Sequence, residues 1–237
     1  MNFKYVLAIA LLCFITPSLF SQVFMPPSEG YSRQKNSYLT LEDGKEITGT
    51  LEKMTRKKGL ISSIEVTDSI SGKKLKFTPN QVKFMYLPPS GLDKLARGMD
   101  FLNDATKWNN QDLDAYRLRK GYVYFEKSEV ELKKGTQVLM LQLLNPSFSG
   151  KVKVFHDPYA NETASVGVAG VTVAGGEDKS YYVKKGKEVA FKLYKKNYDK
   201  EFKDLLGDCP TVTKKYGDKT RWSDFEAAVA AHATECK

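Results

Sequence analysis

Short runs of alternating apolar and polar residues, each ended by a tight turn, constrain the fold more than any other feature of the chain. The run at 37–41 is followed by Glu42-Asp43-Gly44 and then by the alternating residues 45–54. Asp-Gly between two such runs is a strong β-hairpin signal, because the turn needs positive φ angles. Further short runs follow at 60–67, 74–78 and 81–87. The first part of the chain is therefore predicted to be an antiparallel meander or half-barrel.

A second group of runs lies further along, at 121–132, 137–144, 151–156, 166–173, 181–183 and 188–194. The run at 137–144 is almost continuously apolar, which is typical of a strand covered on both faces. Gly175 and Gly176 lie beside interleaved valines, and no GxxxxGK[ST] motif accompanies them, so a hairpin is favoured over a phosphate-binding loop. This region is predicted to be a second antiparallel sheet or sandwich.

Helical patterns occur between the two β regions and at the end of the chain. Leucine and methionine recur at helical spacing between Gly91 and Lys107, after Pro88-Pro89, which predicts a bridging helix. In the tail, Asn197 is a candidate cap for a helix at 198–206, with Gly207 as a left-handed terminator. Ser223, followed by a glutamate three residues later, predicts the cap of a second helix.

Together these patterns predict an α+β, β-rich fold. The expected organisation is a signal peptide at 1–21, an extended leader at 22–36, a small β domain at 37–88, a helical linker at 89–118, a β-sheet or sandwich domain at 119–196, and a helical C-terminal clasp at 197–237 packed on the second β domain. Whether the two β regions form one domain or two is left open by the pattern.

The start of the chain has the features of a secretory signal peptide. Lys4 precedes an apolar run from Tyr5 to Ile15, and small residues follow. We predict cleavage after Ser21, which leaves Gln22 as the mature N-terminus. The run is shorter than the roughly 20 apolar residues that span a membrane, so no transmembrane segment is expected after the signal is removed. A lipoprotein signal is the weaker alternative, because its cysteine, Cys13, lies inside the apolar run.

Removal of the signal also removes Cys13 and leaves Cys209 and Cys236 as the only cysteines. Disulfides persist in exported proteins, so a Cys209–Cys236 bridge is predicted, and closing this loop should stabilise the fold by roughly 3–4 kcal/mol. Free thiols or an intermolecular bridge are the alternatives. A metal site is not expected, because CxxC spacing is absent and the only histidines are His156 and His232. No cofactor is expected either.

The composition supports a folded, basic protein. Hydrophobic residues make up 41% of the chain, enough for a core, and the net charge is +9. Removal of Lys4 lowers this charge to +8. The basic residues occur as short clusters at the ends of apolar runs, which favours solvated turns over a nucleic-acid surface. These clusters are Arg56-Lys57-Lys58, Lys73-Lys74, Lys133-Lys134, Lys184-Lys185 and Lys195-Lys196.

His156-Asp157 at the end of a predicted strand is the best catalytic candidate. A histidine beside a carboxylate can act in acid–base chemistry, but no GxSxG, HExxH or CxxC motif accompanies the pair. A structural or turn-capping role is therefore favoured over catalysis. Aromatic residues in the second β region are similarly expected to pack mainly in the core, with a glycan-binding or peptide-binding platform as the alternative. These aromatics are Tyr122, Tyr124, Phe125, Tyr159, Tyr181 and Tyr182.

Four short segments of the chain are distinctive when taken together. They are Phe-Ser-Gln at 20–22, Leu-Glu-Asp-Gly-Lys-Glu-Ile-Thr-Gly-Thr at 41–50, Lys-Ser-Tyr-Tyr-Val-Lys-Lys-Gly-Lys-Glu at 179–188, and Phe-Lys-Asp-Leu-Leu-Gly-Asp-Cys-Pro at 202–210. In this combination the chain resembles exported, uncharacterised proteins of Bacteroidota-type Gram-negative bacteria. The resemblance implies a periplasmic, outer-membrane-associated or secreted location. It also implies that Ser69, in Asp68-Ser69-Ile70, is an O-glycosylation acceptor, since the tripeptide resembles the short motif of those bacteria.

These observations favour a non-enzymatic binding or structural module of the cell envelope or exterior, with an envelope protein or glycan as partner and no role with nucleic acid. One alternative is a hydrolase-type enzyme that uses His156 and Asp157. The other is a binder of anionic glycan or membrane surface through the lysine clusters.

Overall fold

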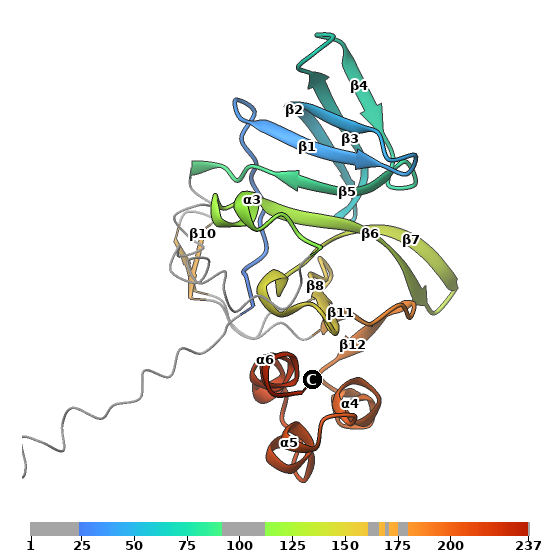
Figure 1. Ribbon diagram of the computed structural model, residues 1–237, viewed down its shortest axis with the longest axis vertical. Helices are drawn as coiled ribbons and strands as arrows, with labels where there is room; N and C mark the ends of the chain where they lie inside the picture. The colour runs from blue at the N-terminus through green and yellow to red at the C-terminus, as the bar shows by residue number, and fades with distance from the viewer. Residues whose placement is uncertain (1–23, 92–111, 161–165, 169–170, 175–179, 237) are drawn as a thin grey trace, which may run out of the picture.

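A large mixed β-sheet of ten strands, with the C-terminal helices gathered at one end, dominates the computed structural model (Figure 1). The structure describes residues 24–91, 112–160, 166–168, 171–174 and 180–236. Its sheet order is β4-β3-β2-β1-β5-β6-β12-β11-β8, and β7 pairs with the other edge of β6. The predicted α+β, β-rich fold is confirmed.

The first five strands form the curled sheet predicted at the start of the chain. They are β1 (Asn36–Leu41), β2 (Glu46–Lys57), β3 (Leu60–Asp68), β4 (Lys74–Phe77) and β5 (Val82–Leu87). The first four follow one another as a meander, whereas β5 returns to pair with β1, where Leu39 lies opposite Met85. This return bends the sheet around an apolar interior that includes Ile64 and Met85.

Strand β6 (Val123–Leu132) joins the two β regions into one sheet. Its first residues pair with β5, and its last residues pair in parallel with β12 (Ala190–Tyr194) along the same edge. The other edge pairs along its length with β7 (Gly135–Gln142). Beyond β12 lie β11 (Ser180–Lys185) and β8 (Val152–Phe155). The predicted second sheet therefore extends the first, and one of its pairings is parallel.

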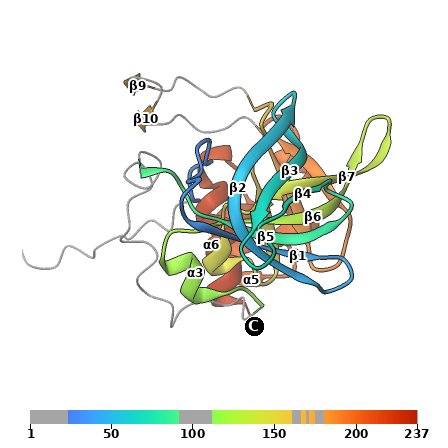
Figure 2. The ribbon, with the colours of Figure 1, turned by 90° about the horizontal axis from the view of Figure 1, so that it is seen from above.

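A separate antiparallel hairpin consists of β9 (Val166–Val168) and β10 (Val171–Ala174). Seen from above, it stands apart from the large sheet (Figure 2). The pairing agrees with a hairpin of the interleaved valines, but the two strands connect between Val168 and Val171 rather than at Gly175 and Gly176, which lie outside the described residues. The bridging helix predicted for Gly91 to Lys107 lies, apart from Gly91, within residues 92–111, which are outside the described residues. The structure places α3 (Ala115–Arg119) immediately before β6, with Asp114 as its cap.

The helices of the tail lie beside β11 and β12, at the end of the sheet away from β1–β4 (Figure 1). The longest are α4 (Tyr198–Leu206) and α6 (Phe225–Glu235), so the predicted C-terminal helical pair is confirmed. Shorter turns link or precede them: α5 (Pro210–Val212), η4 (Thr213–Gly217) and η5 (Trp222–Asp224). A further short turn, η3 (Pro146–Phe148), precedes β8.

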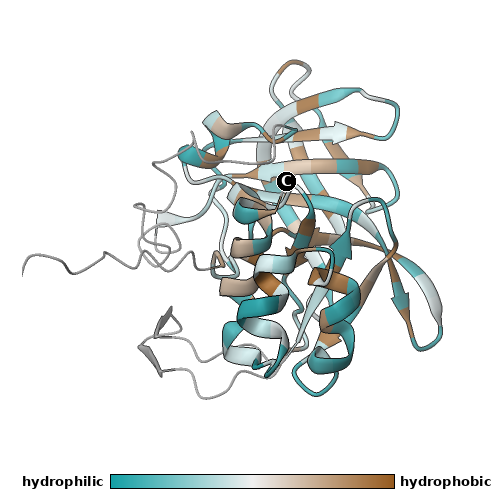
Figure 3. Cartoon of the chain, turned by 60° about the horizontal axis from the view of Figure 1, so that its bottom comes forward, coloured by the Kyte–Doolittle hydropathy of each residue, from teal (hydrophilic) through white to brown (hydrophobic). Residues whose placement is uncertain are grey.

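An aromatic cluster fastens these helices to the sheet. Phe225 of α6 lies 5.4 Å from Trp222 and 5.7 Å from Tyr181 of β11, measured between ring centroids. Phe24, at the start of the described chain, packs edge-on against the same Phe225 at 5.6 Å. Because of this contact, the end of the leader is part of the core rather than a free extension. Hydrophobic and hydrophilic residues alternate along the strands and around the helices (Figure 3).

Three helix ends differ from their predicted caps. Gly207 has φ −71°, a right-handed conformation, because the chain continues in helical turns toward α5, and its amide donates to the Lys203 carbonyl. The side chain of Asn197 accepts a hydrogen bond from the Tyr194 amide at 2.6 Å and so holds the end of β12 instead of capping α4. Ser223 lies inside η5, and Asp224 takes the position before α6 without a side-chain cap bond.

Cys209 and Cys236 lie at disulfide distance, with Cα atoms 5.6 Å apart, within the spacing that a bridge requires. Cys209 is fully buried against α6, and the carbonyl of Cys236 accepts a hydrogen bond from Lys151 at 2.7 Å. The pair joins the residue before α5 to the residue after α6.

Candidate functional site

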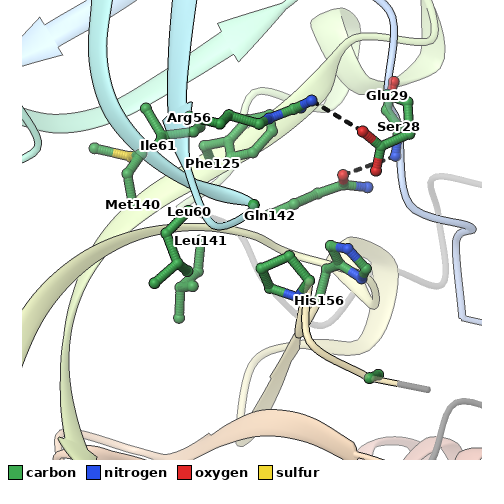
Figure 4. Close-up of a pocket in the computed structure, with 13 residues that line it drawn as sticks. Ser28, Glu29, Arg56, Leu60, Ile61, Phe125, Met140, Leu141, Gln142 and His156 are labelled. Atoms are coloured by element: carbon green, nitrogen blue, oxygen red, sulfur yellow. Dashed lines mark hydrogen bonds and ion pairs between the residues drawn. The ribbon is translucent and has the colours of Figure 1, made fainter.

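A pocket of about 340 Å³ opens where the leader, the β2–β3 hairpin, β7 and the segment after β8 meet (Figure 4). It contains His156, one of the two predicted catalytic candidates. Apolar side chains of β3, β6 and β7 form part of the lining, and polar groups lie at one side. The principal lining residues are Glu29, Arg56, Ile61, Phe125, Gln142 and His156.

The polar side of this pocket ties the leader to the sheet. Arg56 of β2 forms an ion pair with Glu29 at 2.9 Å. The Gln142 side chain of β7 accepts a hydrogen bond from the Ser28 amide at 2.9 Å and donates to the Pro26 carbonyl at 3.3 Å. All three contacts join residues far apart in sequence. Local pattern therefore gave no signal that Arg56, Glu29 and Gln142 would meet at one site.

The tip of the β2–β3 hairpin closes another side of the pocket. Gly59 has φ +77°, a left-handed conformation that glycine adopts without strain, and a Cβ built on it would lie 2.6 Å from Pro158 Cβ. Only a residue without a side chain allows this hairpin to approach the segment after β8 so closely. Gly59 thus sets the distance between the hairpin and the loop that carries His156.

Asp157, the second catalytic candidate, is fully buried and held by three partners. The Lys192 ammonium lies 2.5 Å from one carboxylate oxygen, and the Ser180 hydroxyl donates to the same oxygen at 2.6 Å. The Tyr159 amide donates to the other oxygen at 3.0 Å. A buried carboxylate with a paired charge and satisfied lone pairs is the arrangement expected of a structural group.

The structure does not place His156 and Asp157 in a common site. The two residues are consecutive in the extended segment that follows β8, where successive side chains point to opposite sides. His156 lines the pocket of Figure 4, whereas Asp157 binds Lys192 of β12. The His156 amide donates to the Gln142 carbonyl at 2.9 Å and so fixes the segment against β7. The geometry agrees with the favoured turn-holding role of Asp157.

A second hollow, of about 450 Å³, lies where the β6–β7 hairpin diverges from β12, and we call it the tyrosine groove. Tyr159, Tyr182 and Tyr194 surround Lys192, whose ammonium lies 5.6, 5.7 and 5.2 Å from their respective ring centroids. The remaining residues of the groove belong mainly to the hairpin and to β12: Leu60, Glu131, Leu132, Lys133, Lys134, Gln137 and Phe191.

The predicted aromatic platform is divided between the core and this groove. Tyr124, Phe125, Tyr181 and Tyr182 are buried, as expected for core residues, and Tyr122 is half-buried. Tyr159 differs, because 44% of it is exposed at the groove. Of the lysine clusters, Lys133-Lys134 lies on the hairpin of this groove, whereas Lys74 ends in an exposed ion pair with Glu52 on the β4 edge of the sheet.

His232 is fully buried in α6. Its Nε2 atom lies 2.7 Å from Asp208, which also receives a hydrogen bond from Lys185 at 3.1 Å. Burial alone would raise the pKa of Asp208, but the hydrogen bonds and charges of His232 and Lys185 outweigh it and lower this pKa to about 2. The cluster lies beside Cys209, so ionic and covalent contacts fasten the same corner of the tail.

Ser69 lies in the exposed turn between β3 and β4. Its neighbour Ile70 is 94% exposed, while Asp68 is turned inward and accepts hydrogen bonds from Ser71 at 2.6 and 2.8 Å. The Ser69 hydroxyl lies 3.4 Å from the Asn36 side chain. The predicted acceptor serine is thus exposed at the surface, and its modification stays a prediction.

The predicted cleavage site between Ser21 and Gln22 lies outside the described residues.

Within residues 24–91, 112–160 and 180–236 and the two short strands β9 and β10, no three His, Cys, Asp or Glu side chains are grouped so that they could hold a metal ion. In the same part of the chain no helix has both the length and the apolar character needed to cross a membrane. Comparisons with known protein families, with curated proteins and with solved structures find no match to this chain.

Proposed function

We propose that the chain is an exported, non-enzymatic binding module of the cell envelope or the extracellular space. The observation that carries the proposal is the engagement of Asp157, the carboxylate of the predicted catalytic pair, in a buried ion pair with Lys192. A carboxylate that is fully buried and bonded on both oxygens has no access to a substrate. Among the described residues, the pocket at His156 and the tyrosine groove offer recognition groups rather than an assembled acid–base pair.

The cysteine pair supports the exported location. Cys209 and Cys236 lie at disulfide distance and join the two ends of the α5–α6 segment. Such a bridge persists in an oxidising compartment. Together with the signal-like residues Met1 to Ser21, it favours a mature protein that folds outside the cytoplasm with the bridge formed.

Export is tested by producing the full chain in a Gram-negative host and isolating it from the periplasm and medium. We expect an N-terminus at Gln22 and an intact mass about 2 Da higher after reduction, because two protons are added to a bridge. A protein that stays in the cytoplasm with its first residues intact would contradict the exported location.

The binding role is tested with the purified mature protein, which is offered envelope polysaccharides and a panel of ester, peptide and glycoside substrates. We expect saturable binding of an envelope component without release of product. The variant His156→Ala should give the same result as the wild type if it keeps its circular dichroism spectrum. A product released by wild type, and lost in this folded variant, would instead establish the hydrolase.

A further inference from the structure

The tyrosine groove combines aromatic faces with positive charge at its floor and at its rim. Lys192 lies between the rings of Tyr159, Tyr182 and Tyr194, and a second ammonium, that of Lys196, lies 5.3 Å from the Tyr194 ring centroid. Cation–π contacts hold these rings in place and leave Tyr159 exposed at 44%. The groove is therefore built around fixed aromatic rings before any ligand arrives.

Positive charge exceeds negative charge in the groove. Lys192 is neutralised by the buried Asp157, so the positive charges that the groove presents to a ligand are those of the exposed hairpin residues Lys133 and Lys134. Glu131 is the one acidic residue among the groove's described lining residues. An anionic ligand is thus attracted to the rim, where the lysines lie, while its uncharged part reaches the aromatic faces.

Two further hydrogen-bonding side chains, one neutral and one acidic, complete the lining. Gln137 of β7 offers an amide that both donates and accepts, and Glu131 of β6 offers acceptors for hydroxyl groups. Burial, and secondarily the negative charge of Asp157, raises the pKa of Tyr182, so this tyrosine stays neutral. The lining therefore presents ring faces, neutral hydrogen-bonding groups and ammonium groups within one concave surface.

We propose that the tyrosine groove binds an acidic oligosaccharide, with the apolar face of a sugar ring on Tyr159 and a carboxylate at Lys133 and Lys134. A sugar ring needs a flat apolar surface and many hydrogen-bonding partners, and its carboxylate needs an ammonium group. A single-stranded nucleic acid would use the same rings, but it would bring a continuous row of phosphates past Glu131. The inference rests on the proposed binding role and names its ligand class.

The test is calorimetric titration of the mature protein with a hexamer of galacturonic acid, with cellohexaose as the neutral control. Oligothymidylate and an oligoglutamate peptide of matched charge serve as the other polyanions. We expect binding of the acidic sugar alone, and weaker binding as salt is raised, because exposed charges are screened over about 10 Å at 0.1 M salt. Equal or tighter binding of oligothymidylate, or of the peptide, would overturn the proposal.

Variants locate the binding surface. Tyr159→Ala should weaken binding about threefold to tenfold, the range for loss of one aromatic contact. The double change of Lys133 and Lys134 to Gln should weaken it by a similar factor and flatten its salt dependence. The matched controls, Tyr116→Ala at a 65% exposed tyrosine of α3 and Lys74→Gln at the β4 edge, should bind as wild type.

Two outcomes distinguish this inference from the proposed function on which it rests. If Tyr159→Ala and the lysine double variant both bind the acidic sugar as tightly as the wild type does, the ligand lies elsewhere. That result would overturn the assignment of the groove as the binding site. Failure to bind any acidic sugar, while the protein still binds another envelope component without turnover, overturns the ligand class but leaves the binding role standing. If the wild type turns over a substrate and the folded variant His156→Ala does not, the non-enzymatic binding role itself is overturned.

Discussion

The buried pair of Lys192 and Asp157 gives the sharpest test of the structure. Replacing Lys192 with Met keeps the length of the side chain but removes its charge, and it leaves the fully buried Asp157 carboxylate without a cation. Breaking a buried pair by removing one partner typically costs about 3–5 kcal/mol. Lys192 retains 16% exposure, so water can reach this end of the pair, and we expect a loss near 3 kcal/mol.

The companion changes make the prediction quantitative. Asp157→Asn removes the buried charge and keeps an oxygen for the Tyr159 amide, so it should cost less, about 1–2 kcal/mol. In the double variant the uncompensated charge is absent. Its loss in free energy of unfolding should therefore be smaller than the sum of the two single losses by at least about 1 kcal/mol. As a control, Lys74→Met removes an exposed pair with Glu52 and should cost less than about 0.5 kcal/mol.

The measurement is urea-induced unfolding of the oxidised protein at neutral pH, followed by tryptophan fluorescence and circular dichroism. Coincident transitions would justify a two-state free energy of unfolding. A loss below about 1 kcal/mol for Lys192→Met, or strict additivity in the double variant, would refute the assignment of Asp157 as a charge held by Lys192.

Three further predictions concern the tail and the hairpin. Reduction of the Cys209–Cys236 pair should lower the free energy of unfolding in urea by about 3–4 kcal/mol, and an unchanged midpoint would exclude a closed loop. The pKa of Asp208 is about 2, below the ordinary value of 3.8, so its ionic contribution is complete above pH 3.8 and is lost as the pH falls toward 2. Acid titration followed by circular dichroism should show this loss in wild type and a weaker one in Asp208→Asn. Gly59→Ala should destabilise the protein by about 1–2 kcal/mol, because its left-handed backbone and the nearby Pro158 oppose a side chain, and a neutral effect in urea would contradict this contact.

Features encoded by neighbouring residues were predictable from the sequence. The turn at Asp43-Gly44 has Gly44 at φ +84°, and the Asp43 side chain accepts a bond from the Lys45 amide, as an Asp-Gly hairpin requires. The pairing of Cys209 with Cys236 was predicted because they are the two cysteines that remain once Cys13 is removed with the predicted signal. Strand positions were similarly close to those observed, since alternation reports which face of a strand is covered.

Pairings between distant segments were not predictable in the same way. Nothing in the residues around β5 or β12 indicates that they share one edge of β6, because pairing partners are chosen by the packing of the whole sheet. The polar pocket depends on Arg56 reaching the leader, and the groove depends on Lys192 meeting three separate tyrosines. Asn197 shows the same limit on a small scale, since its side chain bonds back to β12 rather than forward to α4.

The shared strand β6 has a consequence for how the chain folds. Its first half pairs with β5, which has already been synthesised, but its second half must wait for β12, which lies near the end of the chain. Contacts between segments so far apart in sequence form slowly, because a long loop must close before they stabilise anything. The curled N-terminal strands are therefore expected to form first, and the joining of β12 to β6 should limit the folding rate. Until that step, half of the edge of β6 presents unpaired backbone groups to other chains, which makes the interval before β12 arrives the stage most exposed to aggregation.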